Sequence, residues 1–285
     1  MFIVSGATGH VGSAVVEALL DRGHEVIAIT RNAAHADALQ KNGAAIAIAD
    51  LYDVDAMRDV FSRGKRLFLL NPPAEPHTDT DKTEKKTVRH LLAAIKGSGL
   101  KKIVAESTYG AQPGEKLGDL NTLFAMEEGL RDQRIPTVIL RAAYYFSNWD
   151  AMCKSAREGT LPTMFPAALK LPMVAPADLG KAAADLLRAP VEQTGTVYVE
   201  GPEQYSSQDV ADAFANALGR KVDLAVTPRD QWEEAYRTMG FSDEAAYSYA
   251  RMTAIAADGD YDQPRDPVHG STSLQDYIDT LVERG

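Results

Sequence analysis

The sequence predicts an α/β protein, with a doubly wound, mostly parallel sheet followed by a smaller α+β lobe. Short apolar runs alternate with helical stretches through the first half of the chain, which is the pattern of strand–helix–strand units. A glycine-rich turn joins the first apolar run to the first helical stretch. Beyond about residue 150 the alternation loosens. We therefore predict a sheet domain over 1–150 and a lobe over 151–285, segments of which can return to the sheet.

The composition is that of an ordinary globular protein, with 45% hydrophobic and 25% charged residues. The 30 Lys and Arg against 40 Asp and Glu give a formal net charge of −10, which argues against broad binding to nucleic acids or anionic membranes. The single cysteine, Cys153, excludes an internal disulfide and agrees with a reducing cytoplasm. No run approaches the roughly 20 apolar residues of a membrane span. We therefore expect a cytoplasmic protein.

Apolar runs bounded by Gly, Pro or charged residues predict strands that are covered on both faces. They fall at 2–5, 25–30, 44–49, 66–70, 102–106 and 137–140. The stretches between them predict helices at 11–21, 34–41, 54–63, 81–96 and 121–133.

The lobe is predicted to hold both kinds of element. Strands are expected at 169–174, 196–200 and 222–226, and helices at 176–187, 206–218, 231–239, 244–256 and 273–283. Gly159-Thr-Leu-Pro162 and Phe165-Pro166 are interpreted as loops. Asp178 is expected to be an N-cap or first-turn acid of its helix. We expect the lobe to lie over the carboxyl edge of the sheet and to close a substrate pocket there.

The glycine turn carries most of the functional information. The first strand runs directly into Gly6-Ala-Thr8-Gly9-His10-Val11-Gly12, and a helical pattern follows at once. In a dinucleotide-binding unit one glycine permits the tight turn, one lets the backbone approach a pyrophosphate, and one lets the helix pack on the strand. The helix N-terminus then directs free N–H groups at the phosphates, and His10 is expected to border them. The alternative is a glycine-rich turn without a ligand.

The residue after the second strand indicates which dinucleotide binds. An acid there accepts hydrogen bonds from the ribose 2′-OH and repels a 2′-phosphate, whereas an arginine pairs with that phosphate. This chain has Ile29-Thr-Arg31-Asn32 and no acid in those positions. We therefore predict that NADP(H) is favoured over NAD(H), with Arg31 on the 2′-phosphate. The alternative for Arg31 is a solvated residue at the start of a helix.

Residues that follow the other strands are candidates for the same crevice, since ligands of open α/β sheets bind outside the carboxyl ends of the strands. They are Asp50 and Leu51; Asn71, Pro72 and Pro73; Ser107, Thr108 and Tyr109; and Arg141 through Tyr145. His77 follows the fourth strand; we favour an exposed histidine over one that faces the cofactor. The six histidines show no metal-ligand spacing, so we assign no metal.

With these motifs the chain resembles the NmrA-like family of atypical short-chain dehydrogenase/reductase proteins, over nearly its whole length. Besides the glycine turn and Ile29–Asn32, the resemblance rests on Ile135-Pro-Thr-Val-Ile-Leu-Arg141, Tyr144-Tyr-Phe-Ser-Asn148, Val174-Ala-Pro-Ala-Asp178 and Leu274-Gln-Asp-Tyr277. It implies a Rossmann domain that binds NADP(H). The family includes small quinone and dye reductases, related phenylpropanoid reductases, and non-catalytic NADP sensors that regulate partner proteins.

The resemblance also assigns roles to single residues. It implies that Asp50 and Leu51 flank the adenine, and that Asn71 and Pro72, with Pro73 beside them, line the adenosine side. It further places Ser107 and Tyr109 near the nicotinamide. Tyr144, Tyr145 and Phe146 are implied to wall the junction of nicotinamide and substrate.

One expected feature of short-chain dehydrogenases is missing. They use Tyr-x-x-x-Lys, in which the Lys lowers the pKa of the Tyr so that the phenol can relay a proton. In this chain the two positions fall on or near Leu123 and Glu127, and no Tyr is followed by Lys at this spacing.

Two hypotheses follow from that departure. The protein reduces a small planar electrophile such as a quinone without the dyad, and the proton comes from water or from Tyr109, Tyr144 or Tyr145; we favour this one. Alternatively, it is a non-catalytic NADP(H) sensor or transcriptional co-regulator that binds a protein partner. A nucleotide-sugar epimerase fits the fold but needs the absent dyad.

Overall fold

The computed structural model describes residues 1–32, 34 and 36–284. Its centre is an eight-stranded sheet in the order β13-β10-β6-β5-β4-β1-β2-β3, and every neighbouring pair is parallel. The strands are β1 (Phe2–Val4), β2 (Val26–Thr30), β3 (Ala45–Ile48), β4 (Arg66–Leu69), β5 (Lys102–Thr108), β6 (Thr137–Ala142), β10 (Gly195–Glu200) and β13 (Val268–His269). The strand order reverses between β1 and β4, so the predicted doubly wound sheet is confirmed.

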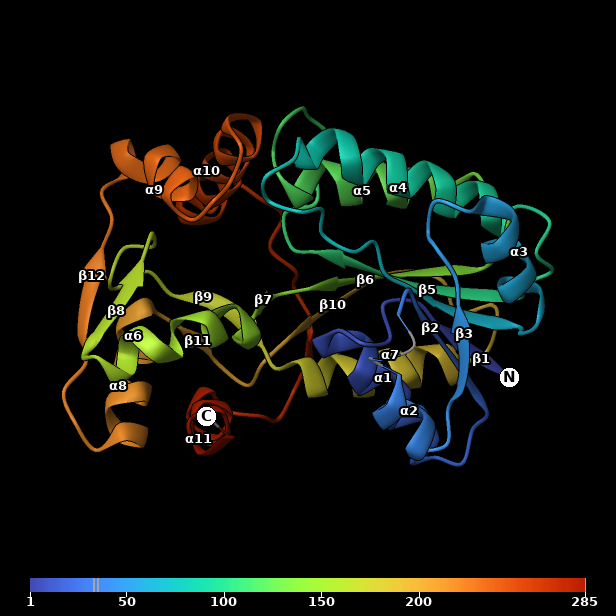
Figure 1. Ribbon diagram of the computed structural model, residues 1–285, viewed down its shortest axis with the longest axis horizontal. Coiled ribbons are helices and arrows are strands. Elements are labelled where there is room, and N and C mark those ends of the chain that lie inside the picture. Colours follow the sequence, from blue (N-terminus) through green and yellow to red (C-terminus); the bar gives the residue numbers. More distant parts are fainter. Residues whose placement is uncertain (33, 35, 285) are drawn as a thin grey trace.

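Helices cover both faces of this sheet (Figure 1). One face carries α3 (Val54–Ser62), α4 (Thr80–Ile95) and α5 (Asp119–Arg131), and the other carries α1 (His10–Leu20), α2 (Asp37–Lys41) and α7 (Pro176–Arg188). The predicted helix at 34–41 is shorter than expected, and its residue 35 lies outside the described residues.

Each face of the sheet buries its own apolar core. Phe61 and Leu91 pack with Leu67 on the α3–α5 side, and Val15 and Leu187 belong to the core on the α1–α7 side. Burial of one such side chain stabilises the fold by about 1.5–3 kcal/mol. The two layers therefore hold the strands, and with them the carboxyl ends that carry the candidate site, in a fixed arrangement.

The lobe is made of short elements on a third apolar core. Its strands are β7 (Tyr144–Tyr145), β8 (Thr160–Thr163), β9 (Leu171–Val174), β11 (Gln204–Tyr205) and β12 (Asp223–Val226). Its helices are η2 (Phe146–Met152), α6 (Cys153–Arg157), α8 (Ser207–Leu218), η3 (Arg229–Gln231), α9 (Trp232–Thr238), α10 (Asp243–Asp258) and α11 (Leu274–Arg284).

The interpretation of 159–162 as a loop is wrong, because β8 occupies most of this segment and pairs in parallel with β12. Leu161 and Thr163 are buried while Thr160 is exposed, which is the alternation of a strand with one covered face. Pro162 removes one backbone donor, and a small two-stranded sheet tolerates this because each of its strands is an edge.

Segments from beyond residue 150 return to the sheet domain, namely β10, β13 and α7. The junction is fixed by Asp178, which lies in the first turn of α7 as predicted. Its buried carboxylate accepts the N–H groups of Ser271 (3.1 Å) and Thr272 (2.8 Å) just after β13. The sheet and the lobe therefore share one continuous framework rather than meeting at a single linker.

The lobe lies at the carboxyl ends of the parallel strands, on the left in Figure 1. Two contacts tie the start of α10 to the loop after β4: the Ser242 N–H donates to the Pro76 carbonyl (2.9 Å) and its hydroxyl to the Thr78 carbonyl (2.8 Å). Arg251 of α10 donates to the Glu115 carbonyl in the loop after β5 (2.9 Å). The helices of the lobe thus bridge the strand ends where we expect the ligand.

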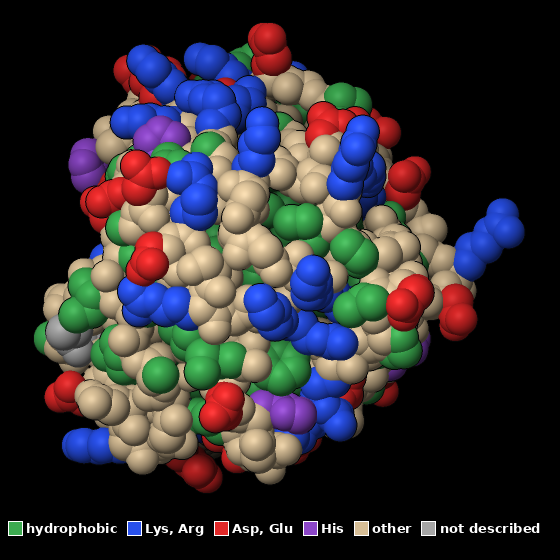
Figure 2. Space-filling model, turned by 90° about the vertical axis from the view of Figure 1, so that its right-hand side faces the viewer, with side chains coloured by type: hydrophobic (Ala, Val, Ile, Leu, Met, Phe, Trp, Pro, Cys, Tyr) green, Lys and Arg blue, Asp and Glu red, His purple; other side chains and the backbone are tan. Residues whose placement is uncertain are grey.

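The face at the amino ends of the strands mixes both signs of charge. Figure 2 shows Lys and Arg side chains interspersed with Asp, Glu and apolar side chains, an arrangement typical of a solvated surface. Within residues 1–32, 34 and 36–284, we find no helix with the length and apolar character that crossing a membrane requires.

Candidate functional site

The glycine loop is anchored to the neighbouring strand at the point where the strand order reverses. Ser5, at the end of β1, is fully buried, and its hydroxyl accepts the Leu70 N–H (2.8 Å) and donates to the Phe68 carbonyl (3.2 Å). Gly6 has φ +62°, a backbone conformation that favours glycine, and its carbonyl accepts the Gly9 N–H at 3.0 Å. These hydrogen bonds therefore hold the loop in one defined turn conformation.

Two glycines of the loop have different surroundings. A Cβ on Gly12 would lie 2.1 Å from the Gly6 carbonyl oxygen, so only glycine fits where α1 crosses the loop. A Cβ on Gly9 would meet nothing nearer than that same oxygen at 3.4 Å. The space in front of Gly9 is thus free of protein and is the space that a side chain would fill.

The N-terminus of α1 opens onto this space. No side chain caps the helix, and its first intrahelical bond runs from the Ser13 N–H to the Gly9 carbonyl. The N–H groups of His10, Val11 and Gly12 therefore have no partner within the helix, and together with the helix dipole they favour an anion. Thr8, Gly9 and His10 are exposed here. The geometry fits a pyrophosphate.

Two buried acceptor atoms beside the loop have no hydrogen-bond partner in the described part of the chain. They are Asn71 Oδ1, after β4, and Glu106 Oε2, in β5. An unpaired buried polar atom is costly, and such atoms concentrate where a ligand supplies the missing bond. They lie on adjacent strands, and β4 in turn neighbours β1, which leads into the glycine loop, so the candidate site extends from the switch point toward β5.

On the other side of the loop, the residues after β2 and β3 face solvent. Arg31 is exposed, and its guanidinium forms no ion pair with the residues that the structure describes. Asp50 is also exposed and accepts the Tyr52 N–H at 2.9 Å, while Leu51 is half-buried against the α3–α5 core. A free cation and an apolar side chain therefore lie where the adenosine half of a dinucleotide is expected.

The predicted tyrosines have different partners. Tyr109 is buried and donates its hydroxyl to Glu200 Oε2 (3.0 Å) of β10, and burial with this carboxylate raises the pKa of Tyr109 far above its ordinary value. Tyr144 is half-buried and packs edge-on against Phe165. Tyr145 is also half-buried and donates to Glu106 Oε1 at 2.6 Å. The structure thus brings Tyr109, Tyr144 and Tyr145 to the ends of β5, β6 and β10.

Three other predicted residues differ in how they relate to the crevice. Pro72 is half-buried and Pro73 exposed, as lining residues would be. Phe146 has no exposed surface and packs in the lobe core against Tyr205 and Tyr277, so its side chain is packed away from the crevice. Three aromatic residues stand in a row at 144–146, so the sequence does not indicate which ring is buried in the lobe core. His77 is exposed, as favoured.

The position expected to hold the dyad lysine is occupied by a buried ion pair. Glu127 has no exposed surface, and both its oxygens accept from Arg141 of β6, Nε–Oε1 and Nη2–Oε2 each at 2.9 Å. Ser107 is also fully buried and donates to the same Glu127 Oε1 at 2.6 Å. Ser107 therefore adds a third hydrogen bond to the Glu127 carboxylate, and its own side chain is buried. The Leu123 and Glu127 positions therefore cannot supply the tyrosine–lysine proton relay of ordinary short-chain dehydrogenases.

Sequence reasoning missed two acids near the site. Glu106 is 4% exposed, and desolvation raises its pKa to about 7 against the hydrogen bond from Tyr145. Glu84 of α4 has its pKa raised to about 8, chiefly by desolvation and then by Asp119. The signal for Glu106 was present in the sequence, since an acid inside a buried apolar strand is uncommon. Glu84 stands among several charged residues at the start of α4, so the sequence does not distinguish it from exposed neighbours.

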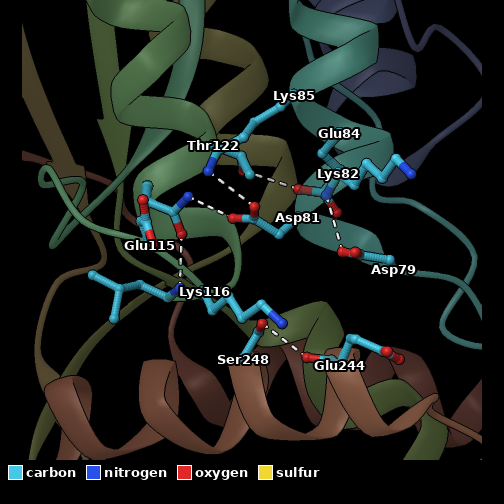
Figure 3. Close-up of polar contacts among 12 residues, drawn as sticks. Asp79, Asp81, Lys82, Glu84, Lys85, Glu115, Lys116, Thr122, Glu244 and Ser248 are labelled. Carbon is cyan, nitrogen blue, oxygen red and sulfur yellow. Dashed lines mark hydrogen bonds and ion pairs between the residues drawn. The ribbon is translucent and has the colours of Figure 1, made fainter.

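Figure 3 shows the junction at which α4, α5 and α10 meet. Glu84 Oε2 accepts the Thr122 hydroxyl (2.9 Å), and Asp81 Oδ1 accepts the Asn121 amide (2.6 Å). Asp79 caps α4 through the Lys82 N–H (3.1 Å). These bonds fix the first turns of α4 and α5 to each other beside α10.

The chain is similar to known proteins over most of its length. The model of the NmrA-like family matches residues 1–280. An NAD(P)H azoreductase from Xenophilus azovorans is 23% identical over 256 residues, 90% of this chain and 87% of that protein. Quinone oxidoreductase 2 of Escherichia coli is 25% identical over 262 residues, 91% of this chain and 89% of that protein.

Solved structures show the same fold. The triphenylmethane reductase of Citrobacter sp. superposes with a TM-score of 0.82 at 19% identity, and each chain is covered to 99%. An NADPH-dependent quinone oxidoreductase from E. coli, complexed with NADPH, superposes with a TM-score of 0.81 at 24% identity, again covering 99% of each chain. The family match spans almost the whole chain, and this protein therefore belongs to the NmrA-like family, as its motifs predict.

Proposed function

We propose that this protein is an NADPH-dependent reductase of a small planar electrophile such as a quinone. The observation that carries the proposal is the free space before Gly9, which faces the uncapped N-terminus of α1. Relatives that align over about nine-tenths of this chain are named NAD(P)H azoreductase and quinone oxidoreductase. The first name states a reduction that uses NAD(P)H and the second a redox reaction of a quinone, which together support the same reaction class here.

The dinucleotide would be held along the strand ends. The N–H groups of α1 would bind the pyrophosphate, and Arg31 would pair with the 2′-phosphate by charge-assisted hydrogen bonds. The nicotinamide half would then lie over the ends of β5 and β6, beyond the buried Asn71 at the end of β4. When bound, the reduced cofactor supplies the hydride and its electron pair.

The residues of this chain would orient the cofactor and the acceptor and would supply a proton. The rings of Tyr144 and Tyr145, at the start of the lobe, supply flat apolar surface on which a planar acceptor can stack. Holding two reactants in a fixed orientation lowers the barrier without covalent chemistry. The proton would come from a tyrosine at the strand ends, because Glu127 is paired with Arg141 and cannot act as the dyad lysine does.

Glu127 stands where a catalytic lysine is expected and is paired with Arg141. This favours a second function, a sensor that binds NADP(H) and reports its redox state to a protein partner. The two functions differ in one outcome. A sensor binds the dinucleotide but does not oxidise it in the presence of acceptors.

The test is a pair of assays on the purified protein. NADPH binding is measured by the change in its fluorescence, and NADPH consumption is measured by absorbance with a panel of benzoquinones and naphthoquinones. We expect saturable binding and acceptor-dependent oxidation. Binding without oxidation would favour the sensor, and absence of binding would overturn both functions.

The choice of cofactor is tested at Arg31. Arg31→Glu removes a cation and places an anion beside the 2′-phosphate, so we expect NADPH affinity to fall about tenfold to a hundredfold, while NADH affinity changes little. Arg63→Glu is the matched control, since Arg63 lies after α3, at the amino ends of the strands. Equal losses for the two cofactors would refute the role of Arg31.

A further inference from the structure

We propose that Tyr145 and Glu106 form a two-residue proton relay, in which Tyr145 protonates the acceptor and Glu106 restores the proton to Tyr145. The inference rests on the proposed function, because it assigns the proton donor for that reaction. Tyr145 is the catalytic residue of the relay. Glu106 acts only through Tyr145 and is therefore a positioning and proton-supplying residue.

The contacts run in one direction, from the interior of the sheet to the crevice. Glu106 lies in β5 with its side chain buried, and its Oε1 accepts the Tyr145 hydroxyl at 2.6 Å. Its Oε2 has no partner among the described residues. Tyr145 is half-buried whereas Glu106 is 4% exposed, so the phenol is the member of the pair with more access to solvent. The acid can therefore exchange a proton with the acceptor only through the phenol.

The surroundings make both protonation states of Glu106 accessible near neutral pH. Desolvation raises the pKa of Glu106 to about 7, and no Lys or Arg pairs with it within the described chain. Tyr145 faces Asp119 of α5 as well as Glu106, and Asp119 in turn faces Tyr249 and Tyr236 of the lobe. All these neighbours are acids or phenols, so none stabilises the Glu106 carboxylate as a cation would.

The other predicted tyrosines lack such a partner. Tyr109 also donates to a carboxylate, but Glu200 is half-buried and lies 3.6 Å from the ring of His269, Oε1 to Nδ1. Glu200 therefore has a histidine neighbour and access to solvent, which the buried Glu106 lacks. Tyr144 contacts the rings of Trp149 and Phe165, and no acid hydrogen-bonds to it in the described residues.

The relay balances with the proposed reaction. The acceptor is reduced by the hydride of the bound dinucleotide, which loses two electrons. One acceptor oxygen gains the Tyr145 proton as the phenolic O–H bond breaks. The carboxyl O–H bond of Glu106 then breaks to re-form the phenol, and after the product leaves, a water molecule returns a proton to Glu106 through the Tyr145 hydroxyl. When Glu106 is ionised, the Tyr145 hydroxyl donates its hydrogen bond to the carboxylate. Glu106 then has no proton to return to Tyr145, and proton transfer to the acceptor stops.

The test compares pH profiles of kcat for the wild type, Tyr145→Phe and Glu106→Gln. The wild-type rate should fall as pH rises through about 7, because the relay needs protonated Glu106. Both variants should lose about a hundredfold in kcat, and Glu106→Gln should lose the pH-dependent limb, since an amide does not titrate. The double variant should lose no more than either single one.

Two variants control for simple loss of buried polar groups. Tyr236→Phe removes the bond of a phenol to Thr253 (2.7 Å), and Glu84→Gln replaces another buried acid; both should keep the limb near pH 7. A second readout needs no cofactor. Difference infrared spectra of the free protein should contain the carbonyl band of a protonated buried acid, lost as pH rises through about 7 and absent in Glu106→Gln.

The outcomes separate this inference from the proposed function. If the wild type oxidises NADPH with quinones but both variants keep its rate and pH profile, the relay is wrong and the reductase stands. An infrared titration of Glu106 complete below pH 5 would likewise overturn the relay. If the wild type binds NADPH without turnover, or does not bind it, the proposed function and the relay fail together.

Discussion

Gly9→Ala is expected to abolish tight NADPH binding while leaving the fold intact. The backbone of Gly9 has φ −86° and ψ 172°, which alanine adopts without strain, and its Cβ would meet no protein atom nearer than 3.4 Å. That Cβ would instead occupy the space that the pyrophosphate needs. We expect NADPH affinity to fall at least about a hundredfold, equivalent to roughly 2.7 kcal/mol, with an unchanged unfolding temperature.

Gly23→Ala at the other end of α1 provides the matched control. Gly23 has φ +75° and open space around its Cβ position, so alanine there should cost about 1 kcal/mol of stability and leave NADPH affinity unchanged. The two variants are compared by fluorescence titration and thermal unfolding. Wild-type NADPH affinity in Gly9→Ala would show that the dinucleotide does not lie against this loop.

The second large effect is expected at the buried pair of Glu127 and Arg141. Arg141→Met leaves the fully buried Glu127 carboxylate with Ser107 and the half-exposed Arg131 (3.3 Å) as its remaining polar partners. Removal of one member of a buried ion pair typically destabilises a protein by about 3–5 kcal/mol. We expect a loss of that size in the free energy of unfolding, measured by urea denaturation at pH 7.

The control is the double variant Glu127→Leu with Arg141→Met. It removes both charges together, so its loss should be well below the sum of the two single losses. Additive losses would show that the two side chains do not depend on each other. The same geometry predicts that Glu127→Lys does not restore a dyad, because it would bury two cations side by side.

Much of the fold could be predicted because local patterns determine it. The glycine loop and the alternating segments indicated the sheet and the position of the site at its carboxyl edge, and β1, α1 and β2 lie within about a residue of their expected bounds. The small sheets of the lobe were harder to predict from the sequence. β8 contains a proline and pairs with β12, some 60 residues later, so no local pattern identifies it.

The polar partners of the site could not be predicted, because they are pairings between distant residues. Glu106 and Tyr145 are 39 positions apart, and Tyr109 and Glu200 are 91 positions apart. The sequence showed that Glu127 departs from the dyad, but not that Arg141 neutralises it. It also gave no sign that Phe146 turns into the lobe core while Tyr144 and Tyr145 stay half-buried beside it.

The account depends most on a phosphorylated dinucleotide that binds in front of Gly9. A crystal structure of the protein grown with NADPH tests this most directly. We expect the pyrophosphate against the N–H groups that begin α1 and the 2′-phosphate within hydrogen-bond distance of the Arg31 guanidinium. An empty crevice at saturating NADPH, or a cofactor bound elsewhere on the molecule, would contradict the account.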